Sequence, residues 1–408
     1  MTLQLLFIYL IHVSVLSGLV YWLWRYSREI LSSKLFYAAL AAKVLAGLGL
    51  GLLYQYHYQG GDTWSYYEQA RQMALLPFKD FWLELTQPLQ SSQPVRAIWF
   101  TRGVSLMVYL GQLDYWLCAV YFSLISFASS IYGLKSFCKW NESYRMPFFF
   151  SFMFIPSLVF WSSGLLKESI GFAAFVIVVG FYARLRARQI RIWDYLLLVC
   201  GLVFLIVIKY YIAALLLPAL IFLRLYHLEF DFWKRWHGLS KSLLIAVLMI
   251  FPAYVFLYWL SPNFRGLEFL QVVQQNHDWI LTKSDEVNGL NGSGLSGVMG
   301  VFADVFYYTY SAIIRPLAFE SFTFPAILSG TENFALLLIA IGFWIKKESH
   351  EVNIEAIVSL IYVLLCAGLL AYSVPNLGTV ARYKVYYMPV LLFLVFNLKR
   401  GFLNRANQ

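Results

Sequence analysis

Residues 192–226 read IWDYLLLVCGLVFLIVIKYYIAALLLPALIFLRLY. They contain two long apolar runs, 192–208 and 211–226, with Lys209 between them. Runs of this kind are typical of helices that cross a bilayer, because about 20 apolar residues span its hydrocarbon core. The stretch therefore predicts two membrane-spanning helices that are joined by a tight turn carrying Lys209.

The rest of the chain has the same character. Of its 408 residues 61% are hydrophobic and 13% are charged, whereas a soluble domain carries roughly a quarter charged residues. This composition and the two runs above predict an all-α polytopic transmembrane bundle of about eleven spans. We expect residues 1–408 to form one membrane-embedded domain. The other predicted spans are 3–24, 35–54, 117–137, 147–160, 169–184, 242–260, 331–346, 354–373 and 384–398. Residues 97–113 fit either a further span or an interfacial helix.

Basic residues gather on one side of this predicted topology. The loops and tails at 25–34, 135–146, 184–191, 224–241, 346–353 and 399–408 hold 19 of the 31 Lys and Arg residues. By the positive-inside rule these segments are cytoplasmic. The net charge of +10 therefore reflects membrane orientation, and we expect no nucleic-acid partner. The four cysteines are dispersed, which predicts neither a disulfide framework nor a zinc site.

Two long connections, 55–116 and 261–330, fall on the opposite, outer side, and we expect amphipathic helices at the outer face in both. Long loops on one face tend to carry function. Within the second connection, residues 284–297 are rich in Gly, Ser and Asn, which predicts a mobile segment.

The first connection contains the motif GGDTWSYY at residues 60–67. Asp62 would lie at the water–lipid boundary, where burial and neighbouring charges tune the proton affinity of a carboxylate. A general base that acts on a hydroxyl at the membrane surface needs such a position. The alternative is that Asp62 caps the helix that follows it. His57 lies nearby in the sequence, although a lone histidine in a loop is usually just solvated.

A second motif, PSLVFWSSGLLKES, covers residues 156–169. Pro156 and Gly164 permit a break between two half-spans, which would leave Lys167 and Glu168 near the membrane surface. Charges close to hydrocarbon need a partner or a task. A lysine beside a helix N-terminus can bind a phosphate. The alternative is a local Lys–Glu pair in an ordinary loop.

Two further basic motifs fall on the same outer side. PNLGTVARYK at residues 375–384 presents Arg382, whose planar guanidinium suits phosphate oxygens, and RPLAFE at 315–320 presents Arg315 and Glu320. The alternatives are an interfacial anchor for Arg382 and a structural ion pair for Arg315 and Glu320. Lys209 either extends its ammonium to the interface or joins the same site.

The shared side of these residues points to a reaction class. One acid suited to be a base and several cations suited to an anionic leaving group would face the same compartment. Transfer of a group from a lipid-linked phosphate needs this set, because the acceptor must lose a proton and the departing phosphate must be stabilised.

On the motifs GGDTWSYY, PSLVFWSSGLLKES and NLGTVARYK, the chain resembles the GT-C superfamily of polytopic glycosyltransferases, and in particular bacterial membrane proteins of exopolysaccharide or cell-surface glycan synthesis. The resemblance implies transfer of a sugar from a polyprenyl-phosphate-linked donor to a glycan or lipid acceptor. It also implies a location in the cytoplasmic membrane, with the active face outside the cytoplasm.

The resemblance also implies roles for individual residues. Asp62 would be the catalytic base, and Lys167 and Arg382 would contact the donor phosphate. Apart from the resemblance, the shared outer face leads us to expect that Arg315 and Lys209 also bind phosphate. We expect positioning roles for Glu168, Tyr66, Glu320 and His57. The chain departs from the family because this loop follows the second span and not the first. Asp62 also has no adjacent acid, so we expect no metal and no other cofactor.

Three other functions fit parts of the sequence. A lipid-linked polysaccharide polymerase or ligase would depend on arginines and not on Asp62. A transporter or flippase for lipid-linked sugars predicts ionisable residues at mid-membrane depth. The predicted spans contain Lys43, which we place near a cytoplasmic end, where extension of the ammonium to the interface accounts for it. A non-catalytic membrane subunit of a polysaccharide assembly also fits.

Overall fold

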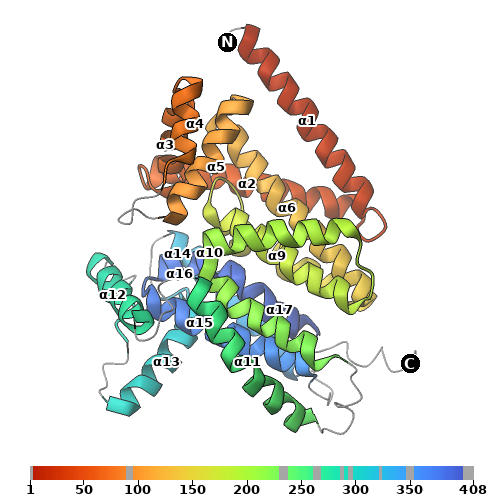
Figure 1. Ribbon diagram of the computed structural model, residues 1–408, viewed down its shortest axis with the longest axis vertical. Helices are drawn as coiled ribbons and strands as arrows, with labels where there is room; N and C mark the ends of the chain where they lie inside the picture. The colour runs from red at the N-terminus through yellow and green to blue at the C-terminus, as the bar shows by residue number, and fades with distance from the viewer. Residues whose placement is uncertain are drawn as a thin grey trace. The chain divides into compact units, whose positions relative to one another are not determined.

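The computed structural model of the protein describes residues 3–88, 95–228, 238–260, 268–284, 289–292, 297–320, 324–345 and 353–397. Every regular element in these ranges is a helix, so the all-α prediction is confirmed (Figure 1). The chain divides into two units, Met1–Lys209 and Tyr210–Gln408, and the boundary falls within one long helix. Each unit is described by itself.

The first unit contains the helices that carry two of the predicted motifs, GGDTWSYY and PSLVFWSSGLLKES. Its elements are α1 (Leu3–Ser27), α2 (Ser33–Leu52), the π-helical turn η1 (Leu53–His57), α3 (Asp62–Ala74), α4 (Phe78–Thr86), α5 (Val95–Gly111), α6 (Tyr115–Trp140), η2 (Glu142–Tyr144), α7 (Arg145–Phe149), η3 (Phe150–Phe154), α8 (Pro156–Trp161), α9 (Lys167–Arg186) and the first part of α10 (Ile192–Tyr226).

The second unit begins with the remainder of α10. It continues with α11 (Gly238–Leu260), α12 (Glu268–Lys283), α13 (Gly297–Ile314), α14 (Phe324–Ile345), α15 (Ile354–Ser373), α16 (Leu377–Tyr383), the short 3-10 turn η6 (Lys384–Tyr386) and α17 (Met388–Asn397).

Seven helices in the described ranges are long and apolar enough to cross a membrane, or up to eight if one bent pair forms a single span. The chain is therefore a polytopic membrane protein, but the count of about eleven spans is not confirmed. Residues 147–160 are split among α7, η3 and α8, none of which is long enough to cross. The two predicted spans of residues 192–226 form one element, α10, which is interrupted by the non-helical backbone of Lys209.

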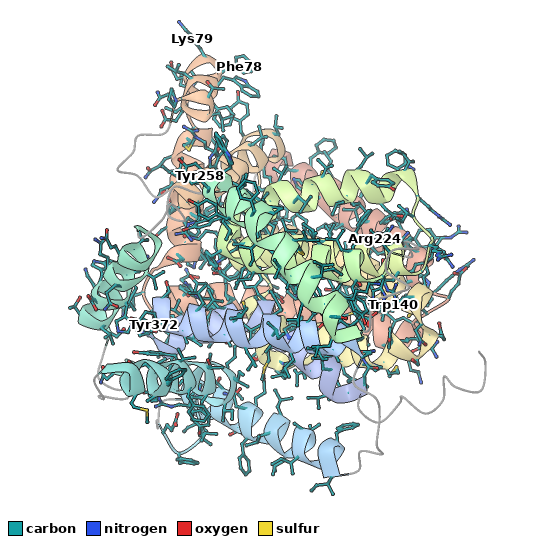
Figure 2. All side chains as sticks on the ribbon, turned by 60° about the horizontal axis from the view of Figure 1, so that its bottom comes forward. Phe78, Lys79, Trp140, Arg224, Tyr258 and Tyr372 are labelled. Atoms are coloured by element: carbon teal, nitrogen blue, oxygen red, sulfur yellow. The ribbon has the colours of Figure 1, made fainter. Side chains whose placement is uncertain are left out.

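The first long connection contains three helices, α3, α4 and α5, of which α3 and α5 pack together. The α5 helix, over the ambiguous stretch 97–113, is not among the helices that could cross a membrane. The α4 helix buries Phe81 against Tyr109. Phe78 and Lys79 stand out at its tip (Figure 2). The second connection contains α12 and α13.

Small residues allow α6 and α9 to pack closely along their length (Figure 1). A Cβ atom on Gly180 of α9 would lie 2.9 Å from the Tyr132 ring and 3.3 Å from the Cα of Gly133 on α6. Four of the five buried serines of α6 donate to carbonyls of the preceding turn, as Ser123 does to Ala119 at 2.8 Å. Close backbone approach and internally satisfied hydroxyls are typical of helices packed in a membrane.

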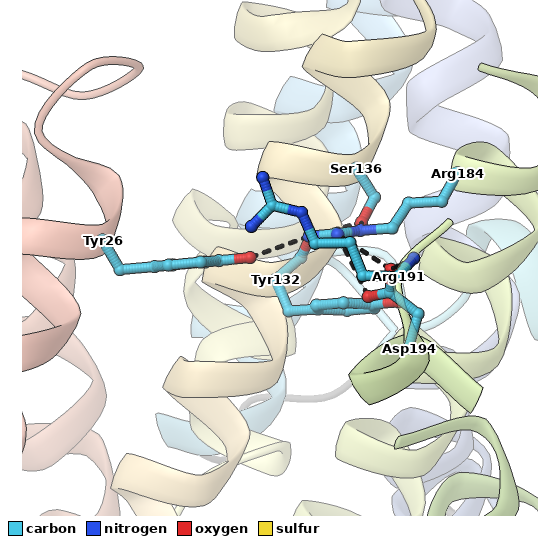
Figure 3. Close-up of polar contacts among 6 residues, drawn as sticks. All are labelled: Tyr26, Tyr132, Ser136, Arg184, Arg191 and Asp194. Atoms are coloured by element: carbon cyan, nitrogen blue, oxygen red, sulfur yellow. Dashed lines mark hydrogen bonds and ion pairs between the residues drawn. The ribbon is translucent and has the colours of Figure 1, made fainter. Parts of the chain in front are cut away.

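Arg184 connects four helices at the end of this packed pair. Its Nε donates to Ser136 Oγ at 2.9 Å and its Nη2 to Tyr26 Oη at 2.8 Å (Figure 3). Its Nη1 lies 3.0 Å from Oδ1 of Asp194, and the backbone N–H of Arg191 donates to Oδ2 of Asp194 at 2.7 Å. Because Arg184 and Asp194 are both buried, each charge is compensated inside the protein.

Replacing Arg184 with Ala is expected to lower the free energy of unfolding by about 3–5 kcal/mol, because the Asp194 carboxylate would stay buried without its partner. The measurement is thermal unfolding of the purified protein in detergent. Arg191→Ala is the matched control, since it keeps the backbone N–H on Asp194 and removes an exposed side chain. Equal melting temperatures for Arg184→Ala and the native protein would contradict this account.

Candidate functional site

The GGDTWSYY motif is docked against the ends of α2 and α6. The Trp64 indole donates to the carbonyl of Gly51 at 3.0 Å and stacks on the ring of Tyr115, with centroids 3.8 Å apart. Thr63 Oγ1 lies 2.7 Å from Tyr115 Oη. These contacts fix the first turn of α3, so the position of Asp62 is set by the helix ends around it.

Two glycines make the turn that enters α3. Gly60 and Gly61 have φ values of 133° and 116°, which only glycine adopts readily. A Cβ atom on Gly61 would also lie 2.9 Å from the Tyr54 ring. The GG pair therefore brings α3 close to Tyr54 at the end of the second predicted span.

Asp62 is the first residue of α3, and the N-cap position belongs to Gly61. The structure therefore places Asp62 one residue after the position that the capping alternative assigned to it. The carboxylate is half-buried and lies at the helix end where the macrodipole favours a negative charge. His57 is exposed, and the contact described for its ring is with Tyr58.

The PSLVFWSSGLLKES motif breaks as predicted, at a loop over residues 162–166 between α8 and α9. Gly164 has a φ of 69°, and its N–H donates to Ser123 Oγ at 3.0 Å. A Cβ atom on Gly47 of α2 would lie 2.8 Å from the backbone nitrogen of Gly164. The loop is therefore pressed directly against the backbone of α2.

Lys43, which lies one turn before Gly47 in α2, contacts the same loop. Its ammonium donates to Ser162 Oγ and lies 4.9 Å from the centroid of the Phe172 ring. Only 3% of Lys43 is exposed. The interpretation that its ammonium extends to the interface is therefore wrong, because the side chain turns inward to the broken segment.

Lys167 is the first residue of α9, and it brings the two predicted motifs together. Its Nζ lies 4.9 Å from the centroid of the Tyr66 ring. Tyr66 is one helical turn from Asp62 on α3. Three residues predicted for one site, Asp62, Tyr66 and Lys167, therefore come from adjacent helix ends of the first unit.

Glu168 and Lys209 form a buried ion pair. Lys209 Nζ lies 2.8 Å from Glu168 Oε1. Lys209 is 3% exposed and Glu168 is 2% exposed. Lys209 is the residue with non-helical backbone in α10, with φ −139° and ψ 54°. The pair therefore fixes the first turn of α9 to the break in α10.

Arg315 and Glu320 belong to the second unit, where they pair with each other. Arg315 Nε lies 2.8 Å from Glu320 Oε1, and Arg315 Nη1 donates to Tyr307 Oη at 3.1 Å. Glu320 Oε2 also accepts from the backbone N–H of Leu317 at 3.0 Å. The ion-pair alternative for this motif is therefore present in the structure.

Lys384, the last residue of the NLGTVARYK motif, connects this motif to the segment that contains the Arg315–Glu320 ion pair. The buried Lys384 ammonium donates to the carbonyl of Arg315 at 3.0 Å and to Asn333 Oδ1 at 3.2 Å. Arg382 is half-buried on the last turn of α16. Lys384 thus connects the segment that carries Arg315 to the one that carries Arg382. The motifs in the sequence did not indicate this role for Lys384.

The segment predicted to be mobile is described at residues 284, 289–292 and 297, and the rest of it lies outside the described residues. The N–H of Leu290 donates to the carbonyl of Pro375 at 2.9 Å, and Asn376 Nδ2 donates to Ser284 Oγ at 2.9 Å. Gly289 forms an isolated β-bridge with Asn376. The described part of the segment is therefore attached to the beginning of the NLGTVARYK motif.

The described residues do not contain a group of three or more His, Cys, Asp or Glu side chains placed to hold a metal ion.

Gly47→Ala is expected to cost about 1–3 kcal/mol of stability, because its methyl group would overlap the backbone of Gly164. Gly49→Ala, in the same helix, has open space around the added Cβ and is expected to be neutral or stabilising by up to about 1 kcal/mol. Thermal unfolding of the two variants in detergent provides the comparison. The same loss in both variants would show that helix α2, and not its contact with Gly164, is responsible.

Comparison of the chain with protein-family models, with curated proteins and with solved structures gave no match. The function is therefore argued from the chemistry of the residues themselves.

Proposed function

We propose that the protein is a membrane glycosyltransferase that moves a sugar from a polyprenyl-phosphate-linked donor to a glycan or lipid acceptor on the non-cytoplasmic face. The observation that carries the proposal is the contact between Lys167 and Tyr66, with Nζ 4.9 Å from the ring centroid. This contact brings the first turn of α9 beside the first turn of α3. A carboxylate and a cation then share one region at the ends of the apolar helices.

Asp62 acts as the base in this proposal. Its carboxylate takes the proton of the acceptor hydroxyl while the hydroxyl oxygen attacks the anomeric carbon of the donor sugar. The bond from that carbon to the phosphate oxygen breaks, and the electron pair leaves with the polyprenyl phosphate. The proton on Asp62 then returns to water.

Lys167 acts on the leaving group. Its ammonium compensates the charge that develops on the phosphate oxygen, and the N-terminus of α9 contributes in the same direction. The Tyr66 ring holds the ammonium by a cation–π contact. Such contacts are worth about 0.5–2 kcal/mol, depending on exposure. This keeps the cation in place before the donor arrives.

Glu168 and Lys209 position these groups in the proposal and do not react. Each satisfies the charge of the other at 2.8 Å. Breaking a buried pair costs far more than breaking an exposed one, so the first turn of α9 is strongly restrained. Lys209, which we expected from its predicted position to bind phosphate, is assigned this restraining role.

A transporter of lipid-linked sugars is the second candidate, and Lys43 favours it. This lysine lies in the middle of an apolar helix and is buried. Ionisable groups at such depth often mark transport pathways. The contact of Lys43 with Ser162 also has a structural purpose, which is to hold the broken segment, so we retain the transferase as the conclusion.

Asp62→Asn is expected to reduce sugar transfer roughly 10²–10⁴-fold, the contribution typical of a general base. The assay uses proteoliposomes with radiolabelled polyprenyl-phosphate glucose, mannose or galactose, and follows the label from the lipid phase into the acceptor or water. Asp80→Asn is the control, because Asp80 is an exposed acid in the first turn of α4. Full activity of Asp62→Asn, with an unchanged melting temperature, would remove Asp62 as the base.

Arg382→Ala separates the transferase from the polymerase or ligase. A transferase with Asp62 as base is expected to keep measurable activity in Arg382→Ala and lose it in Asp62→Asn. A polymerase that depends on arginine gives the reverse order in the same assay. Uptake of the labelled donor into sealed vesicles without chemical change would favour the transporter.

A further inference from the structure

Seven basic residues gather where α6 and α9 end and α10 begins, far along these helices from the residues of the proposed site. They are Lys135, Lys139, Arg145, Arg184, Arg186, Arg188 and Arg191, and we call them the basic cluster. Three acids accompany them, namely Glu29, Glu142 and Asp194. The cluster therefore carries an excess of positive charge.

The three acids are already engaged by particular cations. Asp194 is bound by Arg184 at 3.0 Å, Glu142 lies 3.0 Å from Arg145, and the exposed Glu29 lies 3.8 Å from Lys135. In the part of the chain that the structure describes, Lys139 and Arg191 have no acid within ion-pair distance. These two positive charges are thus not balanced by the described acids.

The excess charge is also crowded. The Lys139 ammonium is close enough to Arg184, Arg191 and Lys135 to be repelled by all three, while Asp194 is the one acid near enough to attract it. Helix C-termini attract cations, which accounts for part of this accumulation at the ends of α6 and α9. It does not account for Arg191, which precedes the N-terminus of α10, where the helix dipole opposes a positive charge.

Aromatic side chains surround the cluster in the manner of a membrane interface. The Arg186 guanidinium lies 5.7 Å from the Trp140 ring centroid, and the Lys135 ammonium lies 4.1 Å from that of Tyr26. Tryptophan and tyrosine favour the headgroup level of a bilayer. Lys135 and Lys139 are half-buried, so an anion beside them would interact in surroundings less polar than water.

We propose that the basic cluster binds the phosphate group of an anionic phospholipid headgroup at the end of the first unit. Lys139 and Arg191 are the primary ligands, because their charges lack an acidic partner. The buried contact between Arg184 and Asp194 keeps the three helix ends together beneath them. The proposal is independent of the reaction catalysed at the other end of these helices.

The test uses the full-length protein in detergent, titrated with phosphatidylglycerol, with phosphatidylcholine of the same acyl chains, or with sodium phosphate. We expect phosphatidylglycerol to raise the melting temperature, and the other two to have little effect. The double variant Lys139→Gln/Arg191→Gln is expected to bind phosphatidylglycerol more weakly by about fivefold for each charge removed. High salt is expected to reduce the difference.

The control double variant, Lys79→Gln/Arg96→Gln, removes the same number of charges from exposed positions on α4 and α5. It is expected to keep the native affinity. Equal loss in both double variants would overturn the proposal, because the effect would then follow net charge alone. Equal stabilisation by phosphatidylcholine, or full stabilisation by sodium phosphate, would also overturn the assignment to an anionic lipid.

Discussion

The close approach of Gly47 and Gly164 is the constraint on which the first unit depends. A backbone that breaks inside an apolar region exposes N–H and C=O groups that lipid cannot satisfy. At Gly164 both backbone groups are satisfied by side chains, because Ser123 of α6 accepts from its N–H and Ser169 donates to its carbonyl. Lys43 of α2 also holds the loop by donating to the side chain of Ser162. Because α9 begins directly after this loop, the contacts that hold the loop also fix the positions of Lys167 and Glu168 in the first turn of α9. A side chain larger than hydrogen at either glycine would separate the loop from the helix.

Buried charge is handled in the same way at both ends of α9. At one end Glu168 is paired with Lys209, and at the other Arg184 is paired with Asp194. Isolated charges are very costly in a medium of low polarity, so each pair ties neighbouring helices to α9. The helix is thus restrained at its first turn, beside the proposed catalytic groups, and at its last turn, beside the proposed lipid site. The two proposed sites therefore lie at opposite ends of one restrained helix, α9. Binding at one site need not affect the other.

The proposed chemistry uses charged residues at the N-terminal ends of α3 and α9. Asp62 and Lys167 are the first residues of α3 and α9, and the Tyr66 ring of the first motif contacts Lys167 of the second. The cations of the second unit are arranged differently. Arg315 is committed to Glu320, while Lys384 connects that segment to the one that carries Arg382. The same four types of charged residue thus serve as structural ties in some places and as candidate ligands in others.

The sequence by itself determined the all-helical membrane character, because apolar runs as long as 192–208 have no other stable arrangement in lipid. It also identified the break at Pro156–Gly164 and the acidic and basic motifs, since glycine, proline and charge are unusual within such runs. The tertiary structure decided how these runs are divided into helices, as in the interrupted α10. It also decided which charged side chains form ion pairs. Lys43 shows the physical reason: whether a lysine in an apolar helix reaches water or turns inward depends on the segment packed beside it, and that segment is more than a hundred residues away in the chain.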